Sequence, residues 1–173
     1  MRYASGTSVS AERTREQMMR ILRQFGADGF GYAERHLQGA VQFQYHKIPV
    51  QFRVRLPSRS DDGIACTDTG RERSANQREQ FWQRETNRRW RAVFLVIKAL
   101  LVGVEEGVIT FEEAFLPYIV WQDGRTTADI LLPPIQAAAE SGALPLLLPE
   151  QAGPPRVETG PSAVLGKKGT RHA

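Results

Sequence analysis

Five arginines lie in two stretches of the chain where their spacing could set guanidinium groups along a phosphate backbone. Two alternate with apolar residues, and three recur at intervals of four and three residues, as on one face of a helix; the residues are Arg53 and Arg55, then Arg84, Arg88 and Arg91. A guanidinium presents a planar fork of N–H donors that matches phosphate oxygens. The pattern predicts non-specific, salt-sensitive nucleic-acid binding. The alternative is a solvated surface whose arginines pair with Glu79 and Glu85.

Two tryptophans, Trp82 and Trp90, stand among the helical arginines. Bases could stack on such rings in a protein that binds single strands. The two are eight residues apart, however, and fall on the apolar stripe of the same predicted helix. This spacing favours burial in the core.

Metal and catalytic chemistry have weaker support. Asp61, Asp62 and Asp68 stand close together, but they lack the spacing of a calcium-binding loop, and Asp62-Gly63 is typical of an ordinary turn. Cys66 has no neighbouring base, and no phosphate-binding glycine loop or zinc-protease motif occurs. We therefore predict a protein that is not an enzyme and that has no metal site and no cofactor.

The elements that must carry the arginines can be read from hydrophobic periodicity. Ser10 predicts the start of a helix over about 11–25, which Gly26 ends. A first strand is expected around Phe30 and Tyr32, and Gly39 interrupts this alternating segment. Two further strands alternate apolar and polar residues, from Val41 to Tyr45 and from Ile48 to Leu56. The pattern predicts a three-stranded antiparallel meander with one polar face.

The second half of the chain reads as mainly helical. Residues 57–73 are predicted to be a long polar loop. Ser74 and Gln77 form a capping box before a helix over about 75–106, with a core stripe of Trp82, Thr86, Trp90, Val93, Ile97, Leu100 and Val104. Thr110 with Glu113, and Thr127, begin shorter helices, the last disturbed by Pro133 and Pro134. Residues 1–149 are expected to form one α+β domain, and residues 150–173 a disordered tail.

Composition limits the class of protein. The 173 residues carry a formal net charge of +4, a moderate excess that suits a polyanionic partner. The single cysteine excludes an intrachain disulfide and favours a reducing, cytoplasmic setting. The longest apolar stretch, residues 92–104, is too short to span a bilayer, so no membrane association is expected.

Several phrases resemble a family of small uncharacterised proteins from bacteriophages and prophages. They are Thr7-Ser8-Val9, Gln24-Phe25-Gly26-Ala27, Arg89-Trp90-Arg91, Thr110-Phe111-Glu112-Glu113 and Asp123-Gly124-Arg125-Thr126. The resemblance covers most of the chain. It implies a mobile-element origin and the cytoplasm of a bacterial host, and it brings no activity with it.

A second resemblance concerns the order of elements. A helix, a three-stranded meander and a long basic helix are similar to the core of phage single-strand annealing proteins of the RecT and Red-beta type, which hold the nucleic-acid backbone in a groove. Residues 88–93 correspond to the basic part of that helix. The order also resembles the double-stranded-RNA-binding domain, although the loop before the second helix lacks that family's lysines.

Two functional hypotheses follow from the sequence. The first is a phage-encoded nucleic-acid-binding accessory protein, acting in replication or recombination through the five arginines. The second is a protein-interaction module, such as an inhibitor of a host enzyme or a structural accessory protein, in which the long helix and the apolar segment Leu144 to Leu148 contact a host protein, a phage protein or a second copy of the chain.

Overall fold

The computed structural model describes residues 9–143. Residues as far as Ile135 belong to one compact unit and residues from Gln136 belong to a second. The apolar segment at 144–148 and the predicted disordered tail at 150–173 lie outside the described residues. The single domain expected over residues 1–149 stays a prediction.

Helix α1, Ala11–Gln24, begins at the residue that the sequence predicts. The Ser10 hydroxyl accepts a hydrogen bond from the Arg13 N–H at 3.2 Å, which caps the first turn. Met18 and Leu22 are fully buried. Gly26 takes a φ of +93°, the left-handed conformation in which glycine commonly ends helices.

The three predicted strands form an antiparallel meander in the order β1-β2-β3. Their bounds are Asp28–Arg35, Gln38–Tyr45 and Ile48–Arg55. His46 and Lys47 both take positive φ, 47° and 68°, as the two-residue turn between β2 and β3 requires. Gly39 does not separate two strands as expected; it lies inside β2 and is buried.

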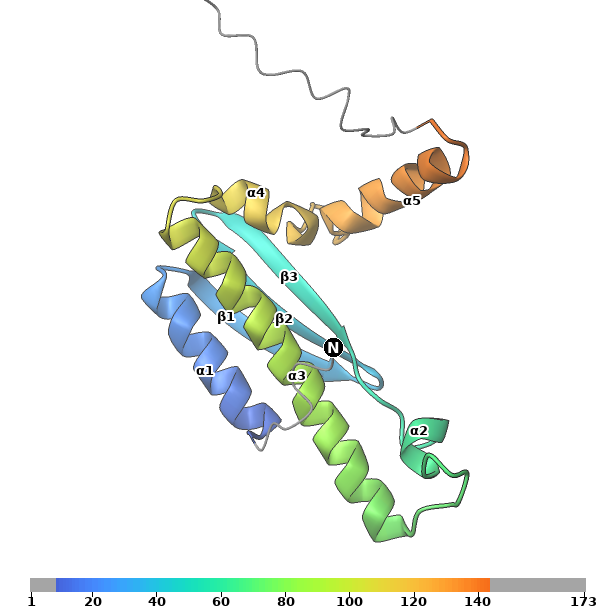
Figure 1. The fold of residues 1–173 in the computed structure, drawn as a ribbon. Coiled ribbons are helices and arrows are strands. Elements are labelled where there is room, and N and C mark those ends of the chain that lie inside the picture. The colour runs from blue at the N-terminus through green and yellow to red at the C-terminus, as the bar shows by residue number, and fades with distance from the viewer. Residues whose placement is uncertain (1–8, 144–173) are drawn as a thin grey trace, which may run out of the picture. The chain divides into compact units, whose positions relative to one another are not determined.

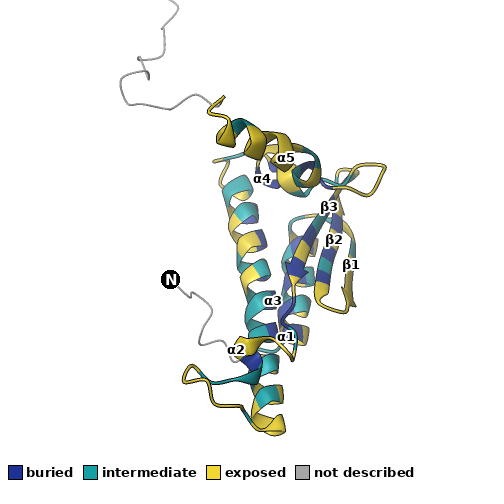
Figure 2. Ribbon diagram, turned by 90° about the vertical axis from the view of Figure 1, so that its right-hand side faces the viewer, coloured by how far each residue is buried: buried dark blue, intermediate teal, exposed yellow. Residues whose placement is uncertain are grey.

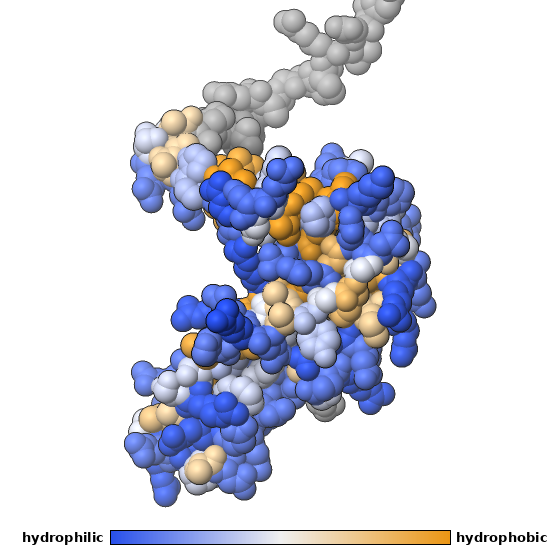
Figure 3. Space-filling model, turned by 180° about the vertical axis from the view of Figure 1, so that it is seen from behind, coloured by the Kyte–Doolittle hydropathy of each residue, from blue (hydrophilic) through white to orange (hydrophobic). Residues whose placement is uncertain are grey.

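Alternation along the strands gives the sheet two different faces. Val41, Phe43, Val50 and Phe52 are buried on the face that α1 and α3 cover (Figures 1 and 2). The other face, here called the open face, carries the polar residues between them, which are Gln42, Gln44, Gln51, Arg53 and Arg55. Hydrophilic residues dominate the side away from α1 and α3, with hydrophobic residues among them (Figure 3).

Helix α3, Ala75–Glu105, is the long helix that the sequence predicts. Both hydrogen bonds of the Ser74–Gln77 capping box are present. The buried stripe is Thr86, Trp90, Phe94, Ile97 and Leu101. Phe94 and Leu101 were not predicted, and the predicted members Trp82, Val93, Leu100 and Val104 are only partly buried. The stripe is displaced because α3 packs against α1 on one flank as well as against the sheet. The first turns of α3 run beyond the sheet (Figure 1).

Short elements complete the described chain. Helix α2, Asp62–Ala65, lies within the segment predicted to be an irregular loop. Helix α4, Phe111–Phe115, has the predicted Thr110–Glu113 capping box and leads into a 3₁₀ turn, η1, Leu116–Tyr118. Helix α5, Thr127–Glu140, contains Pro133 and Pro134 and continues past them. Within residues 9–143 no helix is long and apolar enough to cross a membrane.

Candidate nucleic-acid interface

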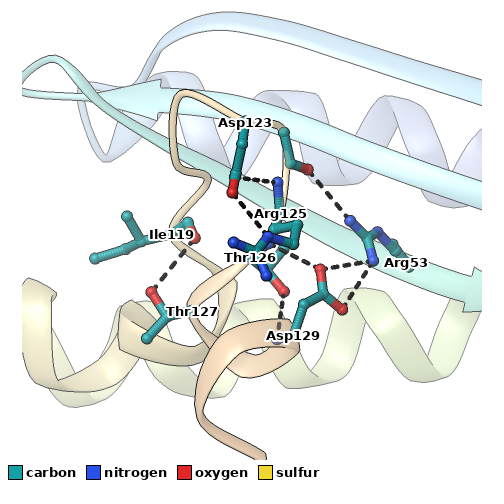
Figure 4. Close-up of polar contacts among 8 residues, drawn as sticks. Arg53, Ile119, Asp123, Arg125, Thr126, Thr127 and Asp129 are labelled. Carbon is teal, nitrogen blue, oxygen red and sulfur yellow. Dashed lines mark hydrogen bonds and ion pairs between the residues drawn. The ribbon is translucent and has the colours of Figure 1, made fainter.

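The two strand arginines project from the open face, and one of them is neutralised. The Arg53 guanidinium lies 2.9 Å from an Asp129 carboxylate oxygen and donates to the Gly124 carbonyl at 3.5 Å (Figure 4). Arg55 is exposed, and its side chain has no ion pair within residues 9–143. Its backbone carbonyl accepts a hydrogen bond from Arg89 at 2.7 Å.

The partner of Arg53 belongs to the start of α5. Asp129 accepts the Thr126 N–H at 2.8 Å, and the Asp129 N–H donates to the Thr126 hydroxyl at 3.3 Å, which is a reciprocal cap. Thr126 therefore takes the capping position predicted for Thr127, whose hydroxyl instead accepts the Trp121 indole N–H at 3.0 Å. The Thr126 N–H, the Thr126 hydroxyl and then Arg53 lower the pKa of Asp129. Arg53 thus ties β3 to α5, as Figure 4 shows.

This network predicts a loss of stability in acid. Because the folded state lowers the pKa of Asp129, the carboxylate contributes stability above its unfolded pKa of about 4, and this contribution is lost as pH falls through the folded pKa. We expect Asp129→Asn to unfold more easily than wild type at pH 7, with a difference that shrinks toward pH 3. Urea unfolding across that range measures it. Asp68→Asn, which removes a carboxylate without a hydrogen bond in the described chain, is the control, and an equal effect there would contradict the assignment.

The three helix arginines have unequal surroundings. Arg88 forms an ion pair with Glu85 in the preceding turn. Arg91 donates to the Gln17 side chain at 2.7 Å and lies over the Phe94 ring, so it joins α3 to α1. Arg84 is exposed, lies 5.2 Å from the centre of the Phe81 ring, and has no carboxylate partner in the described part of the chain.

The five predicted residues therefore do not form one surface. Helix α3 covers the face of the sheet opposite to the open face, from which Arg53 and Arg55 project. Arg53, Arg88 and Arg91 are also engaged in contacts that hold the fold together. Of the five, Arg84 and Arg55 keep a guanidinium that is exposed and not matched by a carboxylate.

Arg84 instead lines a surface groove together with Arg71 and Arg73, two arginines that were not predicted as site residues. Two adjoining surface hollows lie between residues 67–74 and the first turns of α3, and together they are here called the loop–helix groove. They share Thr67, Arg73 and Gln77; one is also lined by Arg71, Glu72 and Ser74, and the other by Gln80 and Arg84. Arg71 and Arg73 come from the end of the segment predicted to be an irregular loop. Their position directly before a capping box was the signal that could have placed them beside the helix.

The groove wall has an ordered structure despite its polar sequence. Cys66 and Glu72 form an antiparallel bridge, and the Asp61 carboxylate accepts the Ser58 N–H at 2.9 Å. Arg73 donates to the carbonyls of Gly63 and Ile64, at 3.0 and 3.1 Å, and to that of Cys66. The Arg73 guanidinium also lies 4.0 Å from the centre of the Phe81 ring. The hydrogen bonds order the loop internally, and the contact of Arg73 with Phe81 holds it against α3.

Another arginine, Arg59, is not available to bind a phosphate because its guanidinium is already paired with a carboxylate. Arg59 makes two hydrogen bonds to the Glu79 carboxylate, at 2.7 and 3.0 Å, and its guanidinium lies 3.7 Å from the centre of a Trp82 ring. The hydrogen bond raises the pKa of Arg59 and lowers that of Glu79. Trp82 donates its indole N–H to the Pro57 carbonyl at 2.8 Å, so its exposure to a stacking base is limited.

Charge is distributed unevenly along α3. Residues 71–91 contain seven arginines and three glutamates, a net charge of +4, whereas residues 105–113 contain four glutamates and no basic residue. Helix α3 has no acidic residue in its first turn, so the positive end of its dipole is not offset there. Residues 9–143 as a whole carry 18 basic and 17 acidic residues, so the positive excess is concentrated in residues 71–91, which include the groove.

Other candidate chemistry finds no organised site in the described chain. Residues 9–143 contain no group of three or more histidine, cysteine or acidic side chains that could hold a metal ion. Asp61 is used in the turn described above, and Cys66 is partly buried with its carbonyl bound by Arg73.

Comparisons with protein-family models, with curated proteins and with solved structures find no match to this chain. The α+β architecture expected from the sequence is confirmed by the structure. The resemblances to phage proteins and to annealing proteins gain no support from the comparisons and stay predictions. The class that fold and site define is a small α+β protein with a basic groove at one end of its long helix.

Proposed function

We propose that the protein binds the phosphate backbone of nucleic acid through the loop–helix groove. The observation that carries this proposal is the grouping of Arg71, Arg73 and Arg84 along this groove at the N-terminal end of α3, where Arg73 lines both of the adjoining hollows. No carboxylate pairs with these three guanidinium groups within the described residues, but Nη1 of Arg73 donates to three loop carbonyls, so Arg71 and Arg84 are the two without a side-chain hydrogen bond. Glu72 lines one of the two hollows, so the groove has a net excess of two positive charges.

The chemistry of the groove suits a backbone better than a base edge. Guanidinium groups, the glutamine amides of Gln77 and Gln80 and the hydroxyls of Thr67 and Ser74 can all donate to phosphate oxygens. Phe81, the aromatic ring closest to them, lies beneath Arg73 and Arg84 and is not presented as a stacking surface. Binding through such contacts is non-specific in sequence and falls with salt.

Binding measurements on charge-reversal variants test the proposal. The full chain should bind fluorescently labelled single-stranded DNA, double-stranded DNA or RNA at 50 mM salt, with an affinity that falls steeply as salt is raised. Arg71→Glu with Arg84→Glu should weaken binding by about tenfold or more, because two phosphate contacts are replaced by repulsion. Both residues are exposed and make no side-chain hydrogen bond in the described structure, so the fold should persist. Fluorescence anisotropy gives the affinities and circular dichroism checks folding.

The matched control makes the same change of charge elsewhere. Arg20 and Arg23 are exposed on α1, away from the groove, so Arg20→Glu with Arg23→Glu should weaken binding by less than about threefold. Arg55→Glu tests the strand face that the sequence predicted. Equal weakening by both double variants would show that overall charge is responsible, and the absence of any binding at low salt would overturn the proposed function.

A protein-interaction role is the second candidate function. It is favoured by exposed apolar side chains on α3, where Val96 and Val102 keep 45% and 43% of their surface accessible. Scattered exposed valines are ordinary, but these two belong to a continuous apolar face of one helix. The two functions use different parts of α3 and do not exclude each other.

A further inference from the structure

The C-terminal half of α3 has an apolar face that the described chain leaves uncovered. Four exposed residues, here called the outer band, recur at intervals of four, three and three; they are Ala92, Val96, Ala99 and Val102. This spacing places them on one side of the helix, away from Trp90, Phe94 and Ile97, which face the sheet. No described element lies over this side of α3 (Figures 1 and 2).

We infer that the outer band binds a second copy of this chain, with the two α3 helices antiparallel. Charge at the two ends of the band argues for this occupant. Arg88 lies one turn before Ala92, and Glu106 lies one turn after Val102, so both fall on the same side of the helix as the band. If the two-fold axis crosses α3 at the level of residue 97, midway between residues 88 and 106, Arg88 of each copy lies opposite Glu106 of the other.

The charge pattern around these residues strengthens the match. Residues 84–91 carry a net charge of +3 and residues 105–113 a net charge of −4. An antiparallel pair sets the basic end of each copy against the acidic end of the other, whereas a parallel pair would set like charges together. The arrangement is self-complementary, as a two-fold interface must be. Small side chains at Ala92 and Ala99 let the helices approach closely.

The interface should be modest in strength. The band covers about three turns, and its ends add ion pairs that water partly screens. Arg88 is already paired with Glu85 in its own helix, so Glu106 of the other copy would share this guanidinium. We expect a dimer with a dissociation constant on the order of 10 µM, below the strength of a standard full-size interface. This inference does not depend on nucleic-acid binding.

Sedimentation of the full chain from 2 to 500 µM tests the inference. A monomer–dimer equilibrium is expected, and added salt should weaken it because opposite charges meet. Val96→Glu with Val102→Glu should weaken dimerisation by at least tenfold, and Glu106→Lys should weaken it and reverse the salt dependence. Leu37→Glu is the matched control, because Leu37 is 42% exposed like the two valines but lies in the turn between β1 and β2. It should leave the equilibrium unchanged.

Three outcomes would overturn the inference. A monomer at every concentration would show that no second copy covers the band. The occupant would then have to be another protein or the chain's own segment Leu144 to Leu148. A dimer that Val96→Glu and Val102→Glu leave intact would place the interface elsewhere. A dimer that salt strengthens would exclude the antiparallel pairing. Thermal melting of each variant, with no change expected at these exposed positions, separates a lost interface from a lost fold.

Discussion

Trp90→Ala should lower the free energy of unfolding by about 3–5 kcal/mol, the range found for removing a buried tryptophan or phenylalanine. Trp90 has no accessible surface and is the largest of the fully buried side chains. Its ring reaches β2 beside Gly39, and the Arg15 guanidinium lies 5.1 Å from a ring centre on another side. A cavity at this position removes contacts of α3 with the sheet and with α1 together. Since small domains are stable by about 5–15 kcal/mol, much of the margin would be lost.

Urea unfolding followed by circular dichroism measures this change without relying on the tryptophan itself. Trp90→Phe is the informative control, because it keeps a six-membered ring and removes an indole N–H that has no hydrogen-bond partner in the described structure. Its cost should be about 1–2 kcal/mol, well below that of the alanine variant. If Trp90→Ala cost less than about 1 kcal/mol, the central place of Trp90 in the core would be wrong.

Gly39→Ala should destabilise the fold by about 1–3 kcal/mol through overpacking. A Cβ at Gly39 would lie 2.7 Å from Val54 Cγ1 and 2.8 Å from Trp90 Cζ2, closer than carbon atoms approach without movement. Val54 and Trp90 are both buried, so neither side chain can swing into solvent. The glycine is required here by space and not by an unusual φ, since its φ does not lie in the left-handed region.

Gly31→Ala is the matched control for this variant. Gly31 lies in β1, has no atom within 4 Å of an added Cβ, and likewise does not have positive φ. Its replacement should change stability by about 0.5 kcal/mol or less. In a Trp90→Phe background, which lacks the indole Cζ2 and Cη2 atoms but keeps the Val54 contact, Gly39→Ala should cost less than in wild type. Additive costs in this double-mutant cycle would contradict the contact.

The fold was largely predictable because local signals agree with one another. Ser74 with Gln77 and Thr110 with Glu113 mark helix starts, and both capping boxes form. Period-two alternation from Val41 to Leu56 likewise gives the correct two strands and the correct buried face. Each of these signals depends on residues within four positions of one another, so no tertiary information was needed.

The site was less predictable because it depends on which guanidinium groups form contacts within the fold and which stay exposed. Arg53 reaches Asp129 and Arg91 reaches Gln17, partners 76 and 74 residues away that periodicity cannot reveal. Gly39 was misread for the same reason, since only the position of Trp90, 51 residues further on, explains why a strand contains glycine there. Arg71 and Arg73 were missed because the order of their loop comes from hydrogen bonds to backbone carbonyls, which leave no periodic signal.

The way α1 is attached has a consequence for how the chain folds. The strands of the meander join neighbours along the sequence through short turns, so their contacts close small loops that form quickly. Docking of α1 on α3 instead joins Ala11 to Asn87, across the whole meander, through a hydrogen bond of 2.9 Å. Closing so large a loop costs chain entropy that few contacts offset until the sheet exists. Helix α1 is therefore expected to be among the last elements to dock during folding. The rate at which it detaches should then set the rate of unfolding.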